Sequence, residues 1–223
     1  MTAPRRFAVI LSGCGNKDGA EIHESVLTLW AIHKHGAEYQ CFAPNIRQHH
    51  VLNFIDNKEM AEERNVLVES ARIARGNIKD LADFRPELYD ALVIPGGLGV
   101  AKNLSDYAFA GPDCQVNESL ATAVRGMADA GKPIGALCIA PVVVARILGR
   151  VEVTIGHDPA TVAALAKMGA THRETGHGGI VIDQANRIVT TPCYMLDARV
   201  DQIGDGAENV VQAILAMLGS SPM

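Results

Sequence analysis

The chain has 223 residues, with 25 Asp and Glu against 20 Lys and Arg, a formal net charge of -5 and 48% apolar residues. An acidic chain offers no basic surface for phosphates, which argues against nucleic-acid partners. The apolar fraction is too high for disorder, and no apolar run approaches the roughly 20 residues of a membrane helix. We therefore expect a soluble globular protein without a membrane partner.

Short apolar strands alternate with amphipathic helices along the chain. The continuous apolar run 7–11 predicts a strand covered on both faces, and apolar residues at helical spacing predict a helix from Ile22 that ends before Gly36. Further strands are predicted at 39–42, 91–94 and 134–137. Such alternation is typical of an α/β fold, with a mostly parallel sheet covered by helices on both faces.

The pattern is weaker between Pro44 and Leu81, where no Pro/Gly/Ser linker marks a domain boundary. We therefore predict one domain, residues 1–223, with an insertion around 44–81. Within the insertion, 51–55 is predicted as a short strand and 65–75 as a helix. The remaining predictions are a strand at 153–155, a helix at 159–168, strands around 180–182 and 188–190, and a last helix at 207–218.

The cysteines are odd in number, widely scattered and never arranged as C-x-x-C, which argues against structural zinc and a disulfide framework. They are Cys14, Cys41, Cys114, Cys138 and Cys193. Reduced thiols of this kind predict a cytoplasmic location. Each is then either a small core residue or a candidate nucleophile.

Ligands of parallel α/β sheets bind at the carboxyl ends of the strands, and the turn around Cys138 lies at such an end. Ala136 and Ala140 provide the small residues that a tight strand-to-helix elbow needs around a nucleophile, and Pro141 suits the first turn of the next helix. The positive end of that helix would lower the pKa of the Cys138 thiol. The alternative is a buried core cysteine.

A glycine-rich turn at 95–99 follows another strand. The backbone N–H groups near Gly96 and Gly97, with that of Ile139, would suit an oxyanion hole, although a plain turn remains the alternative. The P-loop pattern is absent, and Asp18 stands where the third glycine of a dinucleotide fingerprint belongs. We therefore expect no cofactor, and no metal.

Acids and histidines complete the candidate residues. Glu21 and Glu24 lie at the start of the first helix, where one would be a cap and the other solvated, unless Glu24 points into the cleft and exchanges protons with a substrate on Cys138. His157 follows the strand 153–155 and is a candidate to reach the same site.

Several long segments in the same order resemble one family, the PfpI-type, class I glutamine-amidotransferase-like superfamily, and within it the ElbB group. The segments are 12–24, 93–104, 131–141 and 188–195. The resemblance implies a flavodoxin-like three-layer sandwich with Cys138 on a nucleophile elbow. It also implies a homodimer.

The resemblance assigns roles residue by residue. It makes Glu24 the acidic partner of Cys138 and the backbone of Gly97 and Ile139 the oxyanion donors. Many relatives carry His directly after the cysteine, where Ile139 stands here, so His157 is the expected source of an imidazole.

The activity that the resemblance implies is that of a cofactor-free glyoxalase, a lyase that converts glyoxal or a similar 2-oxoaldehyde to the hydroxy acid. A small-molecule aldehyde would form a hemithioacetal with Cys138, and Glu24 would move a proton between its two carbons. The alternative is a redox- or stress-sensing or deglycase-like repair protein with an oxidisable Cys138. A glutaminase is disfavoured by the missing histidine.

Overall fold

The computed structural model describes residues 3–219, in which a seven-stranded sheet has the order β3-β2-β1-β4-β5-β9-β8. Its strands pair in parallel except β8 with β9. The strands are β1 (Arg6–Ile10), β2 (Glu38–Ala43), β3 (Ile78–Asp80), β4 (Ala91–Ile94), β5 (Ile134–Leu137), β8 (Val181–Asp183) and β9 (Ile188–Thr191). A separate parallel pair contains β6 (Glu152–Val153) and β7 (Thr171–His172).

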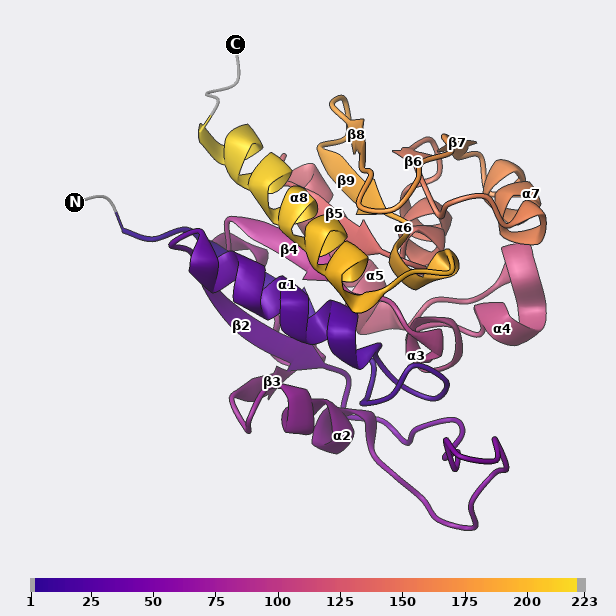
Figure 1. The fold of residues 1–223 in the computed structure, drawn as a ribbon. Coiled ribbons are helices and arrows are strands. Elements are labelled where there is room, and N and C mark those ends of the chain that lie inside the picture. The colour runs from indigo at the N-terminus through magenta and orange to yellow at the C-terminus, as the bar shows by residue number, and fades with distance from the viewer. Residues whose placement is uncertain (1–2, 220–223) are drawn as a thin grey trace.

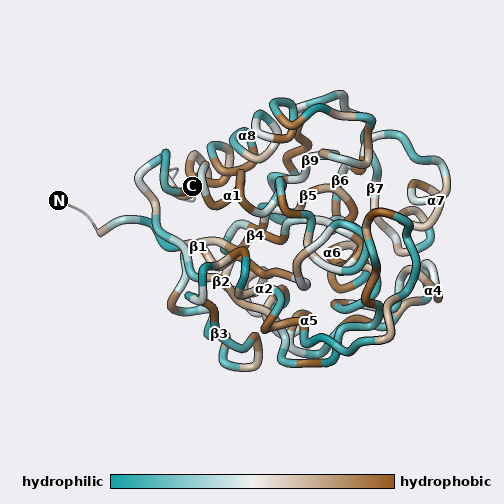
Figure 2. The backbone as a smooth tube through the Cα atoms, turned by 60° about the horizontal axis from the view of Figure 1, so that its bottom comes forward, coloured by the Kyte–Doolittle hydropathy of each residue, from teal (hydrophilic) through white to brown (hydrophobic). Residues whose placement is uncertain are grey.

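Helices cover both faces of the sheet. α1 (Ile22–Lys34) and α8 (Val200–Gly219) lie side by side on one face, and α5 (Glu118–Asp129) packs on β4 and β5 from the other (Figures 1 and 2). The other helices are α2 (Val66–Ile73), α3 (Leu98–Lys102), α4 (Tyr107–Ala110), α6 (Pro141–Leu148) and α7 (Pro159–Lys167). Within residues 3–219, no helix has both the length and the apolarity to cross a membrane.

The core lies between these layers because the central strands are apolar on both faces. All residues of β4 and β5 are buried, and Figure 2 shows the central strands as largely hydrophobic with hydrophilic loops around them. α8 approaches the sheet closely at Gly135, where a Cβ would lie 2.9 Å from Val210 Cγ1. The predicted α/β sandwich with a mostly parallel sheet is therefore confirmed, and it has the flavodoxin-like form.

Three predicted elements differ in the structure, and one of them is the strand expected at 153–155, which is β6 at Glu152–Val153. Residues 51–55 form no strand: Leu52 makes only an isolated bridge, and the Asn53 side chain accepts the Ile55 N–H at 2.9 Å, which favours a turn. The last helix begins at Val200 rather than 207. Its glycines weaken the helical pattern, yet Gly206 is needed because a Cβ there would lie 2.9 Å from Thr191 Oγ1.

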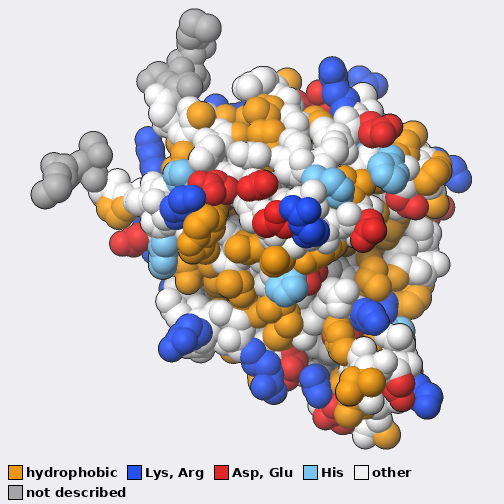
Figure 3. Space-filling view, in the orientation of Figure 1, with side chains coloured by type: hydrophobic (Ala, Val, Ile, Leu, Met, Phe, Trp, Pro, Cys, Tyr) orange, Lys and Arg blue, Asp and Glu red, His pale blue; other side chains and the backbone are white. Residues whose placement is uncertain are grey.

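The predicted insertion contributes α2 and the edge strand β3, while residues 44–65 form an irregular loop that projects from the body (Figure 3). The insertion is attached to the segment after β1 through both this loop and α2. Asp18 Oδ2 accepts the Leu52 N–H at 2.8 Å, and Ser70 Oγ accepts the Gly13 N–H at 2.9 Å. The insertion therefore lies beside the carboxyl edge of the sheet.

Gly99 in α3 fixes the distance between this helix and the segment after β1. A Cβ at Gly99 would lie 2.5 Å from Ser12 O and from Gly19 C, which are backbone atoms. We expect Gly99→Ala to lower the free energy of unfolding by about 3 kcal/mol, because backbone must move to relieve the clash. Gly176→Ala is the control, since nothing lies within 4 Å of that Cβ. Equal melting temperatures for the two variants would contradict this packing.

Candidate active site

The order of the strands in the sheet determines where the site lies. The chain builds the sheet outward from β1 to β3 and then returns to add β4 on the other side of β1. At such a reversal the connections leave toward opposite faces, so a crevice opens at the carboxyl ends of the strands. The segments after β1, β4 and β5 therefore meet, and they carry Glu24, Gly97 and Cys138.

Cys138 directly follows β5 and precedes α6, with a left-handed φ of 59°. Its N–H donates to Thr191 O at 2.9 Å, which fixes the turn to β9. The side chain lines the cleft, although the residue is only 7% exposed. Gly96 makes room for it, because a Cβ at Gly96 would lie 2.4 Å from Cys138 Cβ. This is the geometry of the predicted nucleophile elbow.

Glu24 is completely buried in the first turn of α1 and hydrogen-bonds the Cys138 thiol. Its Oε2 accepts the Gly96 N–H at 2.8 Å, and its Oε1 accepts the Tyr194 N–H at 3.4 Å. Glu21 is the helix cap, since its Oε2 accepts the Glu24 N–H at 2.8 Å. The structure has Glu21 as the cap, and Glu24 is neither solvated nor part of the cleft lining: its carboxyl is buried behind the cleft, against Cys138.

Gly97 and Ile139 donate their backbone N–H groups to Cys138 Sγ. Gly97 has a φ of 95°, and a Cβ there would lie 2.4 Å from Glu21 N. Glycine is therefore required at this position both for the backbone conformation and for the contact with the start of α1.

Burial dominates the electrostatics of the pair. It raises the pKa of Glu24 to about 8, with the Glu21 charge adding to the shift and the Gly96 N–H opposing it. Burial and the Glu24 carboxylate raise the pKa of Cys138 well above its ordinary value, and the N–H groups of Gly97 and Ile139 only partly offset them. The predicted low pKa of the thiol is therefore wrong, because burial outweighs the helix end. Near neutral pH, the pair holds at most one negative charge.

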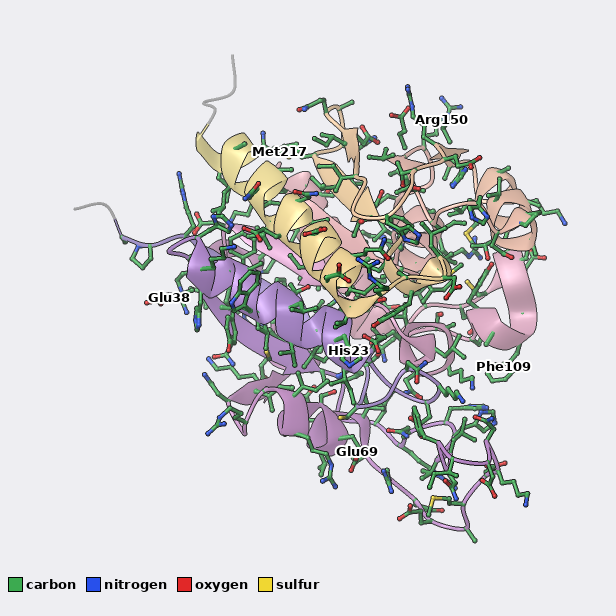
Figure 4. The ribbon with its side chains drawn as sticks, viewed as in Figure 1. His23, Glu38, Glu69, Phe109, Arg150 and Met217 are labelled. Carbon is green, nitrogen blue, oxygen red and sulfur yellow. The ribbon has the colours of Figure 1, made fainter. Side chains whose placement is uncertain are left out.

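The cleft has a volume of about 580 Å³ and combines apolar with polar side chains. Its lining residues are Asn16, Lys17, Glu21, Gly97, Leu98, Tyr107, Cys138, Ile139, Asp158, Thr161, Tyr194 and Met195. Sequence reasoning missed Tyr194 as a lining residue, although its position just after β9, at the same edge of the sheet, was a usable signal. The Tyr194 hydroxyl lies 2.8 Å from Nδ1 of His23, at the start of α1 (Figure 4).

His157 does not join this group. It is exposed and lines a neighbouring hollow with Glu174, His177 and Asp197. The adjacent Asp158 lines the cleft instead, as the cap of α7. In the described part of the chain, no three His, Cys, Asp or Glu side chains are grouped to hold a metal ion.

The family model described as the DJ-1/PfpI family matches residues 77–192. The chain belongs to the DJ-1/PfpI family. It is 42% identical over 232 residues to the human "Glutamine amidotransferase-like class 1 domain-containing protein 3, mitochondrial", covering 98% of this chain and 87% of that protein.

Solved structures agree with the family. An isoprenoid biosynthesis protein with an amidotransferase-like domain from Ehrlichia chaffeensis is 40% identical, with a TM-score of 0.89 over 96% of this chain and 99% of that chain. This match confirms the ElbB-like resemblance. Glyoxalase III from Candida albicans is 17% identical, with a TM-score of 0.58 over 95% and 96% of the two chains, and shares the fold.

The relatives correct the predicted cytoplasmic location. The human, rat and zebrafish proteins are all named mitochondrial, which contradicts the predicted cytoplasmic location. The physical reason for the error is that unpaired cysteines indicate a reducing compartment without identifying which one.

The buried Glu24 carboxyl makes stability depend on pH. Its pKa rises from 4.5 in the unfolded chain to about 8 in the folded protein. Its contribution to stability is therefore fully present below pH 4.5 and is lost as the pH rises through about 8. The loss is at most about 5 kcal/mol, because each unit of pKa shift corresponds to roughly 1.4 kcal/mol.

We expect Glu24→Gln to remove this decline, so that the variant is more stable than the wild type at pH 8.5 and the difference shrinks toward pH 4.5. Urea unfolding of both proteins between pH 4.5 and 8.5 measures this difference in stability. Parallel pH profiles would show that Glu24 is not a buried, protonated acid.

Proposed function

We propose that this protein is a cofactor-independent glyoxalase that converts glyoxal or a similar 2-oxoaldehyde to the hydroxy acid. The observation that carries the proposal is the buried Glu24 carboxyl, hydrogen-bonded to the thiol of Cys138 at the end of β5. A protein of the same fold is named glyoxalase III, which is compatible with this chemistry. The homodimer implied by the sequence resemblance stays a prediction.

The first step joins substrate and protein. The Cys138 thiol passes its proton to the Glu24 carboxylate as sulfur adds to the aldehyde carbon. The aldehyde oxygen gains negative charge near the N–H groups of Gly97 and Ile139, which already face the sulfur. Glu24 then protonates this oxygen, which gives a hemithioacetal and restores the carboxylate.

The second step moves hydrogen between the two carbons. The Glu24 carboxylate removes the proton from the carbon bonded to sulfur, and the resulting enediol is protonated at the neighbouring carbon. The product is a thioester of the hydroxy acid, which water hydrolyses to release the acid and the Cys138 thiol. A pKa of about 8 suits a group that both accepts and donates a proton near neutral pH.

Two other roles receive less support. A sensor cysteine reacts as an accessible thiolate, whereas Cys138 is 7% exposed and burial raises its pKa. We give His157 no step, because it lines a different hollow and Glu24 already provides the proton transfer.

We expect Cys138→Ala to lower glycolate formation from glyoxal at least about 100-fold, because no other group in the cleft replaces the nucleophile. Cys14→Ala is the matched control, since Cys14 does not line the cleft. The assay measures glycolate by chromatography with purified protein. Full activity in the Cys138→Ala variant would refute the proposed function.

A further inference from the structure

Lys17 is the cation that lines the cleft with Cys138, and its charge has neutral partners. Its Nζ donates to Asn57 Oδ1 and lies 5.8 Å from the centre of the Phe54 ring. Among the ion pairs within residues 3–219, none includes Lys17. An ammonium held by an amide and a ring keeps its positive charge available for a ligand.

The acids near Lys17 are engaged elsewhere. Glu21 caps α1, and Asp158 caps α7 by accepting the Thr161 N–H at 2.8 Å and the Thr161 hydroxyl at 2.6 Å. The positive ends of these helices offset the charge of both carboxylates. Asp18 is 2% exposed, and its carboxylate accepts the Leu52 N–H. The positive charge of Lys102 offsets the negative charge of this carboxylate.

The size of the cleft gives the second argument. A volume of about 580 Å³ is far more than a two-carbon dialdehyde fills, so the cleft that both Cys138 and Lys17 line has room for a longer substrate. Glu21 and Asp158 in the same lining disfavour a dianion such as a phosphate ester, whereas a single carboxylate matches the single ammonium.

We propose that Lys17 forms a carboxylate subsite and that the preferred substrate is a 2-oxoaldehyde with a carboxylate at its far end. The inference rests on the proposed function, since it names the substrate class of the same cleft. Cys138 would take the aldehyde carbon while Lys17 pairs with the distal carboxylate.

The insertion positions Lys17 in this arrangement. Phe54 and Asn57 both belong to the loop 44–65, and the loop packs tightly on the segment after β1. A Cβ at Gly15 would lie 2.6 Å from Phe54 Cζ. The insertion thus contributes to substrate choice without contacting the reacting atoms.

The test compares two substrates that differ in the carboxylate, 4,5-dioxopentanoate and 2-oxopentanal. We expect the wild type to favour 4,5-dioxopentanoate about tenfold in kcat/KM, as one ion pair of roughly 1.4 kcal/mol would give. Lys17→Gln should bring this ratio close to one, and Lys17→Arg should keep most of it. Lys79→Gln on the edge strand β3 is the control for net charge and should keep the full ratio. A ratio near one in the wild type, or an unchanged ratio in Lys17→Gln, would overturn the proposal.

Phe54→Leu tests the positioning role of the insertion. It removes the ring beside the ammonium, so we expect KM for 4,5-dioxopentanoate to rise about threefold, with the change in KM rather than in kcat. A merely structural role of Phe54 would instead lower the activity on both substrates together.

A binding measurement separates this inference from the proposed function. The unreactive analogues 4-oxopentanoate and 2-pentanone are compared as protectors of Cys138 against iodoacetamide, with mass spectrometry of the Cys138 peptide. Stronger protection by 4-oxopentanoate in the wild type, lost in Lys17→Gln, supports the subsite even if no aldehyde is turned over. Equal protection by the two analogues would refute the subsite even if glyoxal is consumed.

Discussion

The site depends on one interaction, the hydrogen bond between a buried carboxyl and a buried thiol. Removing Glu24 from water raises its pKa to about 8, and the cost is tolerated because Gly96 and Tyr194 donate N–H groups to the carboxyl. These donors come from the turns after β4 and β9, while the thiol comes from the turn after β5. The carboxyl ends of these three strands must therefore be held at fixed positions relative to one another, because each contributes a group to the proton-sharing pair.

Glycine is required at 96 and 97 because the backbone must come close to the buried carboxyl and thiol. A side chain at Gly96 would collide with Cys138 and Glu24, and one at Gly97 would collide with the backbone at Glu21. Close approach of these backbones brings N–H donors to both partners of the pair. The same approach excludes water, which explains why the pair is both costly to bury and able to exchange a proton at neutral pH.

Much of this arrangement could be predicted from the sequence. Apolar strands alternating with helices indicate the parallel sheet, and small residues around Cys138 with the glycines at 96 and 97 indicate the elbow and its donors. The pKa of Cys138 could not be predicted in this way, because it depends on burial by segments far away in the chain. Lys17 was also missed, since its partners lie in a loop without periodicity. The strand expected at 51–55 failed for the same reason, as local Asn side chains determine the turn there.

The pH dependence of Cys138 alkylation tests the proton-sharing pair most directly. The rate of iodoacetamide labelling of the Cys138 peptide should still be rising above pH 9 in the wild type, because burial and the Glu24 carboxylate raise the pKa of the thiol. In Glu24→Gln the midpoint of this rise should move downward, because the carboxylate that raises the pKa of the thiol is gone, while labelling of Cys14 in the same samples provides the internal reference. A midpoint well below 7 in the wild type, or the same midpoint in both proteins, would contradict the account.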